Sequence, residues 1–109
     1  MTPAAAIAML DRQLAEHGGD ILLTRAAPAA STTVRAQVRG YSGAELAGSI
    51  QQGDSRVILS PTQLNAAAPP WLPQRDDKAV IDGKTFNIED AVPTRLAGVL
   101  VRLDLQVRG

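Results

Sequence analysis

The chain has 109 residues, no cysteine, and eleven basic and eleven acidic side chains that cancel to a formal net charge of zero. This length corresponds to a single domain, residues 1–109. Zero net charge argues against partners that are attracted by charge alone, namely nucleic acid and anionic membranes. One Trp, one Tyr and one Phe are too few for the stacking platforms that bind single-stranded nucleic acid, and without cysteine there is no disulfide or thiolate metal site.

An amphipathic helix is predicted over residues 3–17. Thr2 is suited to cap its N-terminus, and Pro3 is suited to its first position, where no N–H is required. Apolar residues recur with the helical period, and a Gly-Gly pair follows His17, which favours termination there. The apolar stripe consists of Ile7, Leu10 and Leu14. The residues before it lack the basic region of a signal peptide, and no run of about 20 apolar residues occurs in the chain.

Residues 20–109 are predicted to form a β-barrel-like body. Polar and apolar side chains alternate over 31–40 and 99–107, which is typical of strands with one buried face. Asp82-Gly83 between two short runs favours a tight hairpin. The fold class is therefore mainly β with one N-terminal helix (α+β), as a small antiparallel barrel or sandwich. The expected strands are 20–26, 31–40, 54–60, 77–81, 84–88 and 99–107.

The last strand carries the longest alternation. Its odd positions are apolar, and its even positions are polar and predicted to face water. The even positions offer two arginines, an aspartate and a glutamine, and no nucleophile–base pair. These residues are Arg102, Asp104, Gln106 and Arg108. The segment is interpreted as scaffold, so that function is expected in loops and at interfaces.

Two long loops, 41–53 and 64–75, interrupt the predicted strands. Loops of this length in a small domain are commonly functional. The first has three glycines and no sustained period, and it is expected to be mobile in the free protein. Its apolar residues either fold back on the barrel or dock on a partner, and they are Tyr41, Leu46 and Ile50.

The second loop contains three prolines within residues 69–73, which preclude a helix there. Trp71 stands among these prolines. It is either a plug on the end of the barrel or an anchor at an interface, where Trp is enriched.

No catalytic, cofactor or metal site is predicted. His17 is the only histidine, and its position at a helix C-terminus is explained by the helix dipole. The doublets Asp76-Asp77 and Glu89-Asp90 stand at the ends of predicted strands and are interpreted as solvated. They are not expected to act as an acid/base pair, because neighbouring residues on a strand point apart. No serine lies in a G-x-S-x-G pattern, and no glycine-rich stretch matches a phosphate-binding loop.

Two stretches carry a resemblance to a known family. They are Gly-Ser-Ile-Gln-Gln-Gly-Asp-Ser-Arg-Val-Ile-Leu at 48–59 and Asp-Lys-Ala-Val-Ile-Asp-Gly-Lys-Thr-Phe-Asn-Ile at 77–88. Over residues 32–109 the chain resembles the small head–tail joining (head-completion or stopper) proteins of long-tailed bacteriophages and prophages. In that family a strand ends in a polar glycine-containing hairpin, and a long loop between strands orders on assembly.

The resemblance implies a non-catalytic, barrel-like subunit without cofactors. It would form a ring of identical subunits in the virion, between a portal-side adaptor and a tail-side terminator, and it would be in the host cytoplasm during assembly. By position, loop 41–53 matches the family's interaction element. A ring that lines a DNA channel is expected to be charged on one face, and the zero net charge of this chain departs from that expectation. The candidate interface residues are Tyr41, Leu46, Ile50, Gln51, Gln52 and Trp71.

Two alternatives remain at this point. The first keeps the phage particle but makes the protein a tail terminator or a minor tail protein. The second is a stand-alone bacterial β-barrel that binds a small ligand or a peptide. A deep apolar pocket with a few converging polar groups would favour the second.

Overall fold

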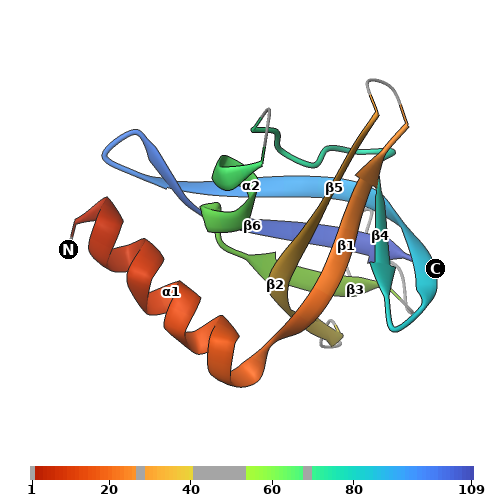
Figure 1. The fold of residues 1–109 in the computed structure, drawn as a ribbon, viewed down its shortest axis with the longest axis horizontal. Helices are drawn as coiled ribbons and strands as arrows, with labels where there is room; N and C mark the ends of the chain where they lie inside the picture. Colours follow the sequence, from red (N-terminus) through yellow and green to blue (C-terminus); the bar gives the residue numbers. More distant parts are fainter. Residues whose placement is uncertain (1, 27–28, 41–53, 68–69) are drawn as a thin grey trace.

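The computed structural model describes residues 2–26, 29–40, 54–67 and 70–109, which form a closed antiparallel barrel with two helices (Figure 1). The barrel order is β1-β2-β3-β6-β5-β4, and β4 closes it by pairing with β1. The predicted fold class is confirmed, as a barrel and not a sandwich. The elements are α1 (Pro3–His17), β1 (Gly19–Arg25), β2 (Ala30–Gly40), β3 (Ser55–Leu59), α2 (Thr62–Ala66), β4 (Lys78–Ile81), β5 (Lys84–Leu96) and β6 (Val99–Arg108).

The barrel interior is aliphatic, as the scarcity of aromatic residues predicts. The alternation in β6 places Leu103, Leu105 and Val107 inside, each at most 2% exposed. The inward face of β2 contributes Val34 and Ala36. Apolar residues near the strand ends, such as Val38 and Val99, are exposed. The period-two pattern therefore identifies which face of a strand points inward. It does not show which residues of that face are buried and which, near the strand ends, remain exposed.

The β5–β6 hairpin is longer than predicted. The strand expected over 84–88 continues in the structure as β5 through Pro93 to Leu96. Only Lys84–Asn87 of β5 pair with β4, so at Pro93 strand β6 is the one strand neighbour among the described residues, and proline is tolerated on such an edge. A turn at Ala97-Gly98, both with positive φ, joins β5 to β6. Figure 1 shows this hairpin projecting past the rest of the barrel.

The prediction of an unbroken loop over 64–75 is wrong at its start. Helix α2 occupies Thr62–Ala66, just before the prolines. Its Leu64 is fully buried in the barrel core. A five-residue helix is too short to show a period in the sequence, and burial of one leucine stabilises it.

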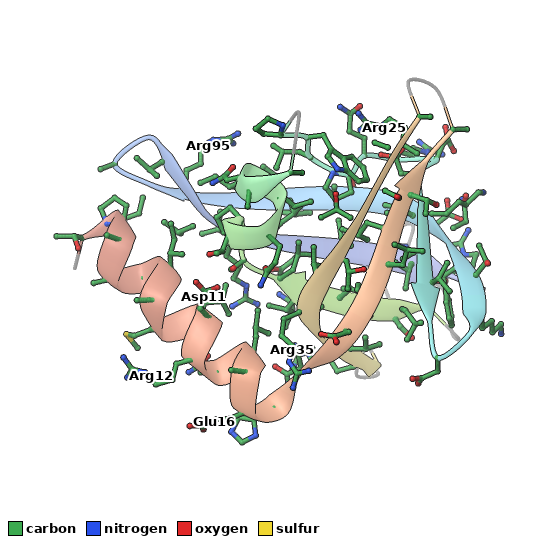
Figure 2. The ribbon with its side chains drawn as sticks, viewed as in Figure 1. Asp11, Arg12, Glu16, Arg25, Arg35 and Arg95 are labelled. Carbon is green, nitrogen blue, oxygen red and sulfur yellow. The ribbon has the colours of Figure 1, made fainter. Side chains whose placement is uncertain are left out.

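Helix α1 is fastened to the outside of the barrel by polar contacts. Thr2 Oγ1 accepts from the Ala5 amide at 3.1 Å, so the predicted N-cap is confirmed. At the other end, Arg35 of β2 donates to the carbonyls of Leu14 and Ala15 at 2.9 and 3.1 Å. Figure 2 shows Arg35 beside this end of the helix.

Mid-helix, both carboxylate oxygens of Asp11 accept hydroxyl hydrogen bonds, one from Ser60 and one from Thr62 at 2.7 Å. These contacts link α1 to Ser60, which follows β3, and to the first residue of α2. Helix α1 ends at His17, as predicted. The imidazole of His17 is exposed and lies 3.7 Å from the Glu16 carboxylate. The side chain that binds the carbonyls at this helix terminus is Arg35.

Candidate functional site

Five of the six candidate interface residues lie outside the described residues: Tyr41, Leu46, Ile50, Gln51 and Gln52. The described residues on either side are close together, because Gly40 and Ser55 are register partners of β2 and β3. Segment 41–53 therefore connects the ends of two adjacent strands at one place on the barrel.

The chain re-enters the barrel at a buried carboxylate. The side chain of Asp54 is 1% exposed and accepts hydrogen bonds from Arg108 Nε at 2.8 Å and Nη2 at 3.0 Å. Gln106 Nε2 donates to the same carboxylate at 2.8 Å. Arg108 also donates to Glu89 at 3.0 Å, and its hydrogen bonds to Asp54 raise the pKa of the guanidinium. This cluster ties Asp54, the residue after segment 41–53, to β6 and, through Arg108 and Glu89, to β5.

A second ion cluster lies on the outer face of β3 and β6. Arg56 donates to Asp104 from Nε at 3.0 Å and also from Nη2, and Arg102 donates from Nε at 2.6 Å. Burial alone would raise the pKa of the Asp104 carboxyl, but the hydrogen bonds and charges of Arg102 and Arg56 outweigh it and lower the pKa below its ordinary value.

The prediction that the even positions of β6 face water is therefore only partly right. Gln106 is buried at 7% exposure, and the side chain of Asp104 is 14% exposed. Glu89 was also predicted to be a solvated strand end, but it lies within β5 and pairs with Arg108. Alternating Arg and Asp on one strand face was the signal available in the sequence. Asp54 carried no such signal, because its partners are 52 and 54 residues away.

Trp71 is partly buried and packs against the hydrophobic core. Its indole Nε1 donates to Thr32 Oγ1 at 2.8 Å, and the Arg25 guanidinium lies 5.0 Å from the ring centroid. Arg25 also forms a bidentate pair with Asp77. The interpretation of Asp77 as a solvated strand end is wrong, since this residue is 8% exposed. An interface role for Trp71 stays a prediction.

A cleft of about 490 Å³ opens beside Trp71. The start of β2, the end of α2 and the indole ring line it, and none of the described residues that line it is charged. Gln63 is one of the lining residues, and its side-chain oxygen Oε1 is buried with no hydrogen-bond donor among the described residues. This site has no signal in the sequence, because Gln63 resembles any surface glutamine there. The lining residues are Ala29, Ala30, Ser31, Thr32, Gln63, Ala66, Ala67 and Trp71.

Within the described ranges, no three His, Asp or Glu side chains come together as a metal site would require. His17 is exposed and its neighbour Glu16 is equally so, so their contact offers no environment that would prepare a general base. No helix in the described part of the chain is long and apolar enough to cross a membrane.

Comparison of the chain with protein-family models, curated proteins and solved structures finds no match.

Proposed function

We propose that this protein is a structural connector subunit that joins the head of a long-tailed phage or prophage particle to its tail. It acts as a ring-forming head-completion or stopper protein. Its partners are identical subunits, a portal-side adaptor and a tail-side terminator, and its work involves surfaces and not a catalytic centre. The proposal starts from the sequence resemblance in residues 48–59 and 77–88.

The observation that best supports this proposal is the anchoring of Asp54. A loop that docks on a neighbour fixes the position of its own subunit only if the ends of the loop are held firmly in that subunit. The buried Asp54 carboxylate, with hydrogen bonds from Arg108 and Gln106, holds the residue that follows segment 41–53 against strand β6. Charge-assisted bidentate bonds of this kind are the stronger class of hydrogen bond and define geometry well.

The barrel also suits a subunit under mechanical load. Each strand pairs with two neighbours in a closed ring, so separation of one strand breaks two ladders. The helix α1 is bound to the barrel by Asp11 and Arg35, so that the described parts move as a unit in this proposal.

The test is a phage or prophage that carries Leu46→Ser together with Ile50→Ser. Loss of two apolar anchors at a docking surface costs about 2–4 kcal/mol each when the anchors are hot spots, and repetition around a ring multiplies the loss. The expected lysate contains DNA-filled heads and separate, complete tails. The matched control is Leu22→Ser with Val99→Ser, which removes two exposed apolar groups from the barrel and hairpin and leaves infectivity intact.

Normal particles from the Leu46/Ile50 variant would overturn the docking role of the segment. Tails that fail to stop growing would replace the head-side role with that of a tail terminator. Circular dichroism of both purified variants establishes that each protein is folded before the lysates are compared.

A further inference from the structure

The cleft beside Trp71 has a composition that selects against charged ligands. Its lining consists of four alanines, two hydroxyl residues, one glutamine and the indole ring. The nearest cation in the Trp71 contacts, Arg25, is paired with Asp77 and donates to the Leu72 carbonyl at 2.7 Å. A ligand with a net charge would lose hydration here without gaining an opposite charge.

One wall of the cleft is a strand edge without a partner strand. Strand β2 pairs with β1 from Ala30 onward, but with β3 only from Ala36 onward. The edge of residues 30–35 that would continue towards β3 has no backbone partner among the described residues. In an antiparallel strand, alternate residues direct both their N–H and C=O groups to the same edge. Residues 30–32 therefore offer main-chain donors and acceptors beside the cleft.

Gln63 also lines the cleft and carries an acceptor that has no donor among the described residues. Gln63 Oε1 is buried, and leaving a buried acceptor without a hydrogen bond costs roughly 1–3 kcal/mol. Gln63 as a whole is only partly buried, so rotation of its side-chain amide brings Oε1 to a ligand N–H group, and the new hydrogen bond offsets that cost. Trp71 also lines the cleft and supplies an apolar surface.

We propose that this cleft binds an extended, uncharged peptide segment of a partner protein. The segment adds as a strand to the edge of β2 at Ala30–Thr32, packs on the Trp71 ring and donates a hydrogen bond to Gln63 Oε1. This is recognition by strand addition, in which main-chain bonds give affinity and side-chain pockets give selectivity. The site is separate from segment 41–53, and it does not depend on the connector proposal.

The experiment begins with random heptapeptides displayed and selected on the full-length protein, with the Ala66→Phe protein, whose cleft is filled, as the counter-target. Enriched peptides are synthesised with acetylated and amidated ends and titrated into ¹⁵N-labelled protein. The chain has one Trp, so its single indole N–H signal reports on the cleft. We expect uncharged peptides that shift this signal, and we expect methylation of a central peptide nitrogen to abolish binding.

The Gln63→Leu variant tests the hydrogen bond. One hydrogen bond of about 1 kcal/mol corresponds to a loss of about fivefold in affinity, with no loss of thermal stability, since the variant removes an unpaired buried acceptor. Gln37→Leu, an exposed residue of the same strand β2, is the matched control and leaves affinity unchanged.

Three results would overturn the proposal: no enrichment over the Ala66→Phe protein, enriched peptides that leave the indole signal unmoved, or affinity that survives N-methylation. Binding of benzamide, a neutral N–H donor, in the absence of any peptide binding would replace the peptide with a small molecule. Infectivity of the Leu46/Ile50 variant is measured separately, so that failure of one proposal does not imply failure of the other.

Discussion

Arg25 and Asp77 join the first strand to the segment before β4, across 52 residues of sequence. Arg25 Nε lies 3.2 and 3.1 Å from the two carboxylate oxygens, and Nη2 lies 2.9 Å from one of them. The same guanidinium covers the Trp71 ring, and Asp77 also accepts from the Gln74 amide at 2.8 Å. One ion pair therefore fixes both the position of Trp71 and the entry to β4.

Asp77→Asn is expected to destabilise the fold by roughly 2–4 kcal/mol. Removing one partner of a largely buried ion pair leaves the other charge without compensation, and this pair has side chains that are 17% and 10% exposed. The neighbouring Asp76→Asn is the matched control. Asp76 is exposed and has φ of 76°, which Asn tolerates, so its effect is expected within about 0.5 kcal/mol. Urea denaturation measures both; equal effects would contradict the assigned role of Asp77.

Gly18 and Gly19 are adjacent but are expected to respond very differently to alanine. A Cβ on Gly18 would lie 2.6 Å from the Leu14 carbonyl oxygen and 2.7 Å from that of Ala36, whereas a Cβ on Gly19 meets nothing within 4 Å. Gly18→Ala must push the helix terminus away from β2, at a cost of about 1–3 kcal/mol. Gly19→Ala is expected to change stability by less than about 1 kcal/mol. Thermal unfolding of the two variants gives the comparison, and a stable Gly18→Ala protein would show that α1 can shift freely.

The sequence predicted those features that depend on neighbouring residues. The helix over 3–17, the Asp82-Gly83 hairpin and the inward face of β6 follow from caps, turn residues and alternation, and all three are present. Closure of the barrel through β1 and β4 was not predictable, because it depends on strand pairs far apart in the sequence.

The same reason explains the errors at the candidate site. Asp77 and Glu89 look like solvated strand ends until their partners Arg25 and Arg108 are placed beside them. The cleft at Gln63 forms where β3 stops pairing with β2, and a pattern of residue types does not reveal where a ladder ends. Candidate residues in 41–53 lie outside the described residues, so their interface role rests on the sequence.

Asp104 gives the fold a predictable pH dependence. Its folded-state pKa is lowered by Arg102 and Arg56, so its stabilising contribution is present above the ordinary value of 3.8 and is lost as the pH falls through the folded-state pKa. The difference in unfolding free energy between wild type and Asp104→Asn is therefore expected to be largest near neutral pH and to shrink below pH 3.8. Urea titrations at several pH values measure it. Asp82→Asn, at an exposed turn, is the control that should not reproduce this trend.

The register of β6 is tested by Leu103→Asp and Arg102→Ala. Leu103 is 2% exposed inside the barrel, where an unpaired charge costs several kcal/mol, so Leu103→Asp is expected to unfold the domain. Arg102 points outward with a side chain 38% exposed, and Arg56 still neutralises Asp104 in its absence. Arg102→Ala is therefore expected to cost at most about 1 kcal/mol, the upper range for a solvent-exposed ion pair. Circular dichroism and thermal melts distinguish the two. A one-residue slip exchanges the faces, so comparable losses in both variants would mean that the register of β6 against β3 and β5 is wrong.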